Sequence, residues 1–103
     1  MAYLIQILLP LSDNHGRPFG PSEYQRVRRE LRERWGGLTA YTRSPAEGSW
    51  ADEGEDFTHD DIIVFEVMSE VLDRPWWRDY RRQMEQRFRQ DVIVVRVQII
   101  EVL

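Results

Sequence analysis

Two histidines are the side chains of this chain best suited to moving protons near neutral pH. His59 lies between Thr58 and Asp60, directly before an apolar run, where a neighbouring carboxylate could orient it as a general base. His15 lies in an Asp-Asn-His-Gly sequence, which is typical of a turn. We therefore take His59 and His15 as the catalytic candidates, and the alternative for each is an ordinary exposed turn histidine.

Other chemistry is sparsely represented in the sequence. There is no cysteine, and neither histidine has a second histidine at ligand spacing, so we expect no transition-metal site. The acids of residues 52–56 resemble a hard-cation site in composition, but they lack the spacing of an EF-hand loop. We predict a solvated turn there, no bound metal and no cofactor.

The elements that would position these residues follow from the hydrophobic periodicity. Apolar or alternating runs predict strands over residues 3–9, 38–43, 62–68 and 92–102. A first helix is expected from Ser22 as N-cap, with Gln25 completing a capping box, to Gly36. A second helix is expected from Asp73 as N-cap to Gln90.

This order predicts an α+β fold of the ferredoxin-like βαββαβ type, formed by one domain over residues 1–103. Right-handed crossovers give a four-stranded antiparallel sheet in the order 4-1-3-2, with both helices on one face. Residues 38–68 read as a long hairpin between the second and third strands. Its tip, residues 44–61, holds seven acids and no base, and a disordered acidic loop is the alternative.

The sheet face away from the helices is predicted to mix apolar and polar side chains. Such a face usually marks a partner surface or a ligand cavity. One reading is a homodimer through this face or through the hairpin, and the other is a small-molecule pocket beside the hairpin. The candidate ligand or interface residues are Gln6, Tyr41, Arg43, Trp50, Glu66, Arg96 and Gln98.

The charge pattern supports a weaker, third hypothesis. The net charge is −4, and all 14 basic residues are arginines, concentrated in the two predicted helices, where they could follow a phosphate backbone. These arginines alternate with glutamates and glutamines, which favours solvated, ion-paired helix faces and makes nucleic-acid binding unlikely. No apolar run approaches the ~20 residues of a membrane span, and we expect a cytoplasmic protein without a membrane partner.

By its order of elements the chain resembles the ferredoxin-like superfamily, in particular the small dimeric α+β barrel proteins. It is also similar to uncharacterised small bacterial proteins whose middle hairpin carries a tryptophan and an acid-glycine turn, here Trp50 and residues 52–56. The resemblance implies pairing of two open sheet faces and a homodimeric interaction or small-ligand-binding domain. Its alternative implication is a cofactor-free enzyme of oxygenase or isomerase type, using His59 or His15.

Overall fold

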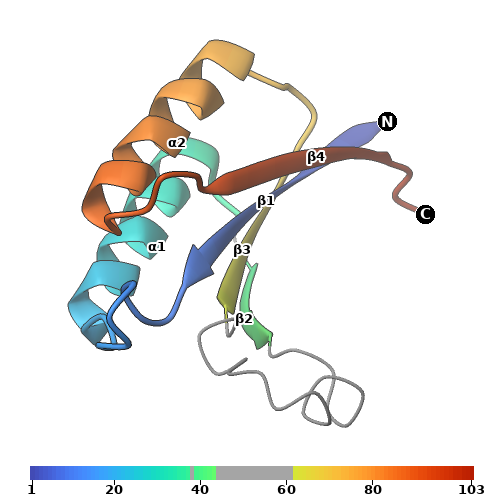
Figure 1. The fold of residues 1–103 in the computed structure, drawn as a ribbon. Coiled ribbons are helices and arrows are strands. Elements are labelled where there is room, and N and C mark those ends of the chain that lie inside the picture. The colour runs from blue at the N-terminus through green and yellow to red at the C-terminus, as the bar shows by residue number, and fades with distance from the viewer. Residues whose placement is uncertain (38, 44–61) are drawn as a thin grey trace, which may run out of the picture.

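The computed structural model describes residues 1–37 and 62–103, together with the backbone of residues 39–43. The elements are β1 (Ala2–Pro10), α1 (Pro21–Trp35), β2 (Thr39–Arg43), β3 (Ile62–Ser69), α2 (Arg74–Arg87) and β4 (Val94–Ile100). Both helices cover the same face of the sheet, and among the described residues no helix lies on the other face (Figure 1). Neither of these helices has the length and apolar character that crossing a membrane would require.

The central position of β1 follows from its composition. It is an apolar run interrupted by Gln6, as expected for a strand with neighbours on both sides. The strands lie in the order β2-β3-β1-β4, and every neighbouring pair is antiparallel. Ile7 pairs with Phe65 on β3 and with Val95 on β4, which places these three apolar residues side by side beneath the helices.

The expected ferredoxin-like plait with a long hairpin needs correction. The extended part of the antiparallel sheet has three strands, β3, β1 and β4, whereas β2 adds only five residues at one edge. The pairing of β2 with β3 ends at Arg43 and Ile62, and the remainder of the expected hairpin, residues 44–61, lies outside the described residues. We describe the fold as two helices on one face of an antiparallel sheet, an α+β arrangement.

The first helix also begins differently from the prediction. Gly20, not Ser22, is its N-cap, and no side chain caps it, so the predicted capping box with Gln25 is wrong. Pro21 explains the earlier start, because proline suits the first helical position, where its missing N–H would have no partner. At the other end Gly36 adopts a φ of 89°, which supports the predicted role of a glycine in ending this helix.

Asp73 is the N-cap of α2, as predicted, and its side chain accepts a hydrogen bond from the backbone N–H of Trp76 at 3.2 Å. The helix ends at Arg87, earlier than the predicted Gln90, and Arg89 then has a positive φ of 50°. β4 is shorter than predicted at both ends. The turn after α2 therefore includes residues that the hydrophobic pattern assigned to helix or strand.

The core lies between the helices and the sheet. From the sheet it takes Ile5, Ile7, Leu9, Ile63, Phe65 and Val67, and from the helices Val27, Leu31, Trp77, Tyr80 and Met84, with Phe88 directly after α2. At one end of the helix pair Trp35 stacks on Trp77 with centroids 5.6 Å apart, and Trp76 stacks on Tyr80 with centroids 4.8 Å apart. This aromatic cluster gives Trp76 a place in the packing between α1 and α2.

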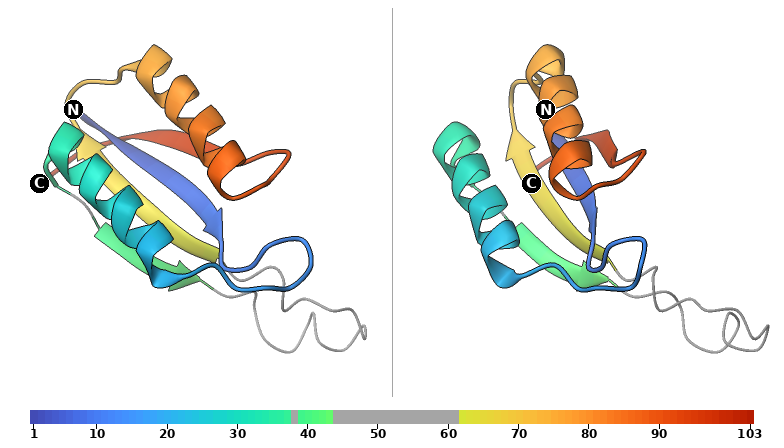
Figure 2. Two further views of the ribbon diagram at one scale, coloured as in Figure 1. Left: turned by 90° about the vertical axis from the view of Figure 1, so that its left-hand side faces the viewer. Right: turned by 60° about the vertical axis from the view of Figure 1, so that its left-hand side comes forward.

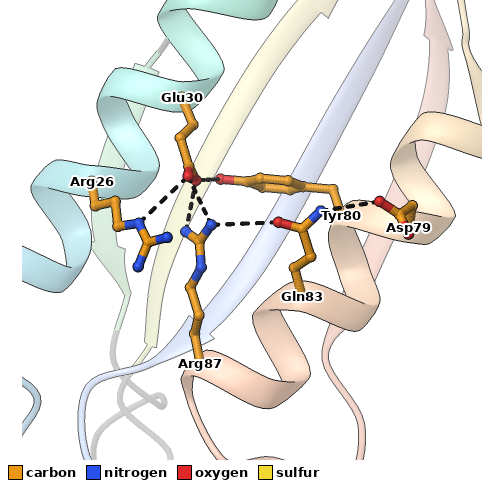
Figure 3. A network of polar contacts seen from close by, with 6 residues as sticks. All are labelled: Arg26, Glu30, Asp79, Tyr80, Gln83 and Arg87. Atoms are coloured by element: carbon orange, nitrogen blue, oxygen red, sulfur yellow. Dashed lines mark hydrogen bonds and ion pairs between the residues drawn. The ribbon is translucent and has the colours of Figure 1, made fainter.

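A charged network joins the two helices, which run side by side across the sheet (Figure 2). Arg87 on α2 donates to both carboxylate oxygens of Glu30 on α1, at 2.6 and 2.7 Å, and the Tyr80 hydroxyl donates to Glu30 at 2.8 Å (Figure 3). Arg26 lies 3.5 Å from the same carboxylate. The side chains of Arg87 and Glu30 are 14% and 30% exposed, so water screens this pair only in part.

The network shifts the titration of its members. Burial by itself would raise the pKa of Glu30, but the hydrogen bonds from Arg87 and Tyr80 outweigh burial, and the pKa lies below its usual value. The hydrogen bond to Glu30 raises the pKa of Arg87, and burial together with that carboxylate raises the pKa of Tyr80. A carboxyl group with a lowered pKa stabilises the folded state above its unfolded pKa, and this contribution is lost as the pH falls through its folded pKa.

Glu30→Gln is therefore expected to lower the free energy of unfolding at pH 7 by about 1 to 3 kcal/mol, because Arg87 loses a charged, two-point acceptor. The difference from the wild type should shrink as the pH falls below about 4.3, where the unfolded glutamate is already protonated. Urea unfolding of the variant and the wild type at pH 7 and pH 3 measures this difference in the free energy of unfolding. Glu33→Gln, at an exposed position on the same helix, is the matched control and should change stability by less than about 0.5 kcal/mol; equal losses in both variants would contradict the assignment.

Candidate functional site

Three polar side chains meet at the centre of the sheet face that carries no helix, which we call the open face. Gln6 on β1 pairs in register with Glu66 on β3 and with Arg96 on β4. The Gln6 Nε2 donates to Glu66 Oε2 at 2.6 Å, and Arg96 Nε donates to Gln6 Oε1 at 2.7 Å. All three were candidates from the sequence, and the structure brings them together as a cross-strand triad.

Gln6 is the central member of the triad. Among residues 1–37 and 62–103 it is the polar residue that is buried, with 7% of its surface exposed. A buried amide is tolerated when both its donor and its acceptor sides are used, and here a charged partner takes each side. Because Glu66 and Arg96 lie on opposite sides of β1, the triad carries negative charge over β3 and positive charge over β4. The open face is therefore polarised across its strands.

Apolar side chains surround this triad on the same face. Leu8 pairs in register with Val94, and Leu4 pairs with Met68. Met68 is 52% exposed and Val94 is 46% exposed, whereas the two leucines are partly buried. Exposed apolar groups around a central charged cluster are typical of a surface that meets a partner.

The remaining candidates on the sheet are less well placed or are known only by backbone. Gln98 is exposed on β4, where its register partner on β1 is Leu4. For Tyr41 and Arg43 the backbone pairs with Val64 and Ile62 on β3. These positions put them on β2, beside β3, and the two strands β3 and β1 lie between them and Arg96.

The catalytic candidates do not join the triad. His15 lies in an exposed loop after β1, where its backbone N–H and that of Arg17 donate to Asp13 Oδ1 at 2.8 and 2.9 Å. Hydrogen bonds from the backbone of Arg17 and His15 hold the pKa of Asp13 below its usual value. His59 and Trp50 lie outside the described residues. The enzyme hypothesis thus gains no described base near Gln6.

Many helical arginines are used within the protein. Arg34 is 3.3 Å from Asp73 and lies over the ring of Trp35 at 4.2 Å, and Arg81 is 3.7 Å from Glu85. These contacts fit the reading of ion-paired helix faces better than a continuous phosphate-binding track. The sequence reading treated all of these arginines alike and missed that Arg74, Arg78 and Arg81 line a cleft beside β4. Their spacing of four and three residues, with Trp77 between them, was the available signal.

Gln6→Ala is expected to lower the free energy of unfolding by about 1 to 3 kcal/mol, because it removes two hydrogen bonds to charged groups at a buried position. Gln98→Ala changes the same residue type on an exposed stretch of the same face, and its effect should stay within about 0.5 kcal/mol. Chemical denaturation of both variants measures the difference. Similar losses would show that the triad adds nothing beyond strand propensity.

Comparisons with known proteins give no information about the function of this chain. No family model matches the chain, and no match is found among curated proteins or among solved structures. The resemblance drawn from the order of elements is thus not carried further. Function has to be argued from the open face and its surroundings.

Proposed function

We propose that this protein is a homodimeric interaction domain whose two copies pack their open faces together. The observation that carries the proposal is the cross-strand triad formed by Glu66, Gln6 and Arg96. The exposed apolar side chains of Met68 and Val94 around it supply surface whose burial would favour association. A second copy is the chosen partner because the charges of the triad are complementary to themselves under two-fold symmetry.

The symmetry argument follows from the strand order. Two sheets that pack face to face are related by a two-fold axis lying in the plane between them. If that axis runs along β1, β4 of each copy faces β3 of the other, and Arg96 comes opposite the partner's Glu66 twice. If the axis runs across the strands, β4 faces β4, and like charges meet. The triad therefore favours the axis along β1.

The distances permit this pairing. Neighbouring strands lie about 4.8 Å apart, and packed sheets lie about 10 Å apart, which an arginine and a glutamate can span together. Aligned sheets cross at about 30°, which displaces groups one strand from the axis by only about 2.5 Å. Each ion pair would form at the centre of the interface, with apolar side chains around it. Its charge complementarity would fix how the two surfaces align.

We expect the wild type to dimerise at micromolar concentration, and Arg96→Glu or Glu66→Arg alone to weaken self-association at least tenfold, about 1.4 kcal/mol. Each single variant puts like charges opposite each other in both contacts. Mixing the two variants should restore a heterodimer, because every contact between positions 96 and 66 then joins one glutamate to one arginine. Light scattering after size exclusion and sedimentation velocity measure the masses.

The controls are Arg82→Glu and Glu101→Arg, charge reversals at exposed positions on α2 and after β4, which should leave association unchanged. Each single variant is expected to fold, because the Gln6 amide has two donors and its carbonyl has two acceptor sites. A wild type that stays monomeric at 100 times the micromolar concentration at which we expect a dimer would contradict the proposal. So would a mixture that forms no heterodimer, which would point instead to pairing through another surface.

A further inference from the structure

A second feature lies on the helix side of the sheet, away from the open face. A cavity of about 250 Å³ opens between α2 and β4, where α2 lies over the β1 and β4 side of the sheet (Figure 2). Ile5, Val95 and Val97 contribute apolar lining from the sheet. Val97 is 44% exposed although its register partner Ile5 is buried, because β4 is the outer strand.

The α2 wall of this cleft is cationic. Arg74, Arg78 and Arg81 line it from one helix face, at spacings of four and three residues. The described residues that line the cleft include no carboxylate. Glu85, one turn beyond Arg81, lies 3.7 Å from Arg81 Nε and also accepts the backbone N–H of Ile93 at 3.2 Å, so its charge is divided between two donors.

Two polar atoms of the cleft's own residues are buried without a hydrogen-bond partner in the described structure. They are Nε1 of Trp77, a residue with 4% exposure, and Nε of Arg81. Arg81 Nε keeps its ion pair with Glu85 at 3.7 Å, and the side chain of Arg81 is 40% exposed, so the rest of its guanidinium group can meet a ligand in the cleft. Trp35 Nε1 is also buried without a hydrogen-bond partner, but Trp35 does not line the cleft. Trp77 and Arg81 are separated by one helical turn and both residues line the cleft, but these two atoms are themselves covered by protein.

We propose that this cleft binds a small amphiphilic organic anion. Its apolar body packs against Ile5, Val95 and Val97, and its anionic head pairs with the guanidinium groups of Arg78 and Arg81. The cavity is a little smaller than the roughly 300 to 1,000 Å³ of drug-sized sites, which sets the ligand at about ten non-hydrogen atoms. An anion is favoured over a neutral apolar molecule because three arginines line one wall and the described lining residues include no carboxylate. Arg96 of the triad also borders the cleft, although its Nε donates to Gln6 on the open face.

Octanoate is the probe, because it joins an eight-carbon body to one carboxylate. Titrated into the ¹⁵N-labelled wild type, it should shift the indole N–H signal of Trp77 and the backbone signals of β4 residues that line the cleft, in a saturable manner. Trp77→Phe identifies that indole signal by its loss. 1-Octanol, which lacks the charge, and acetate, which lacks the apolar body, should each bind at least fivefold more weakly.

Arg78→Gln and Arg81→Gln should each weaken octanoate binding at least fivefold. Arg82→Gln is the matched control, because Arg82 is exposed on the same helix and does not line the cleft, and it should bind as the wild type does. If the loss of the Glu85 contact prevents Arg81→Gln from folding, Arg78→Gln and Arg74→Gln carry the test. Circular dichroism and thermal unfolding establish which variants are folded.

Three results would overturn the proposal. Equal affinity for octanol and octanoate would show that the arginines play no part. Equal weakening by Arg82→Gln and Arg78→Gln would show attraction by overall charge rather than by a site. Shifts confined to Gln6, Glu66 and their neighbours would place the ligand on the open face, independently of whether the protein dimerises.

Discussion

The whole structure depends on the position of β1 between β3 and β4. In this strand, alternate residues point to opposite sides of the sheet. Ile5, Ile7 and Leu9 are buried in the core beneath the helices, while Gln6, between them, is buried on the open face. The same pairing register that aligns Ile7 with Phe65 and Val95 also aligns Gln6 with Glu66 and Arg96. A slip of one residue would turn every one of these side chains to the wrong face.

The helices are held over this sheet by contacts of two kinds. Large apolar groups such as Met84 and Phe88 are completely buried against the strands, and their burial supplies the main driving force. The two-point ion pair between Glu30 and Arg87 adds geometric specificity, because it fixes how α1 and α2 lie beside each other. The hydroxyl of Tyr80 joins the aromatic cluster to this ion pair through its bond to Glu30.

Parts of this organisation could be predicted from the sequence, and the reasons are physical. The helical stripes and the α+β class follow from periodicity, and Asp73 was recognisable as a cap because its side chain can accept a backbone N–H. Strand alternation placed Gln6, Glu66 and Arg96 on one face, but their contact depends on register, which long-range pairing decides. Ser22 was chosen as a cap because hydroxyl residues usually cap helices, whereas Gly20 and Pro21 provide an earlier start. The cleft beside β4 was missed because it depends on how far α2 reaches over the outer strand, which is set by tertiary packing.

The two proposed surfaces share β4 but use opposite sides of it. Arg96 contributes its Nε to Gln6 on the open face and also borders the cleft, which its neighbours Val95 and Val97 line on the helix side. An outer strand can serve in this way because one of its edges has no neighbour among the described strands, so its side chains on both faces are only partly covered. Substitutions at Arg78 act on the cleft without touching the triad, and substitutions at Glu66 do the reverse. Because Arg78 borders only the cleft and Glu66 belongs only to the triad, substitutions at these two positions allow binding in the cleft and association through the open face to be established or excluded one at a time.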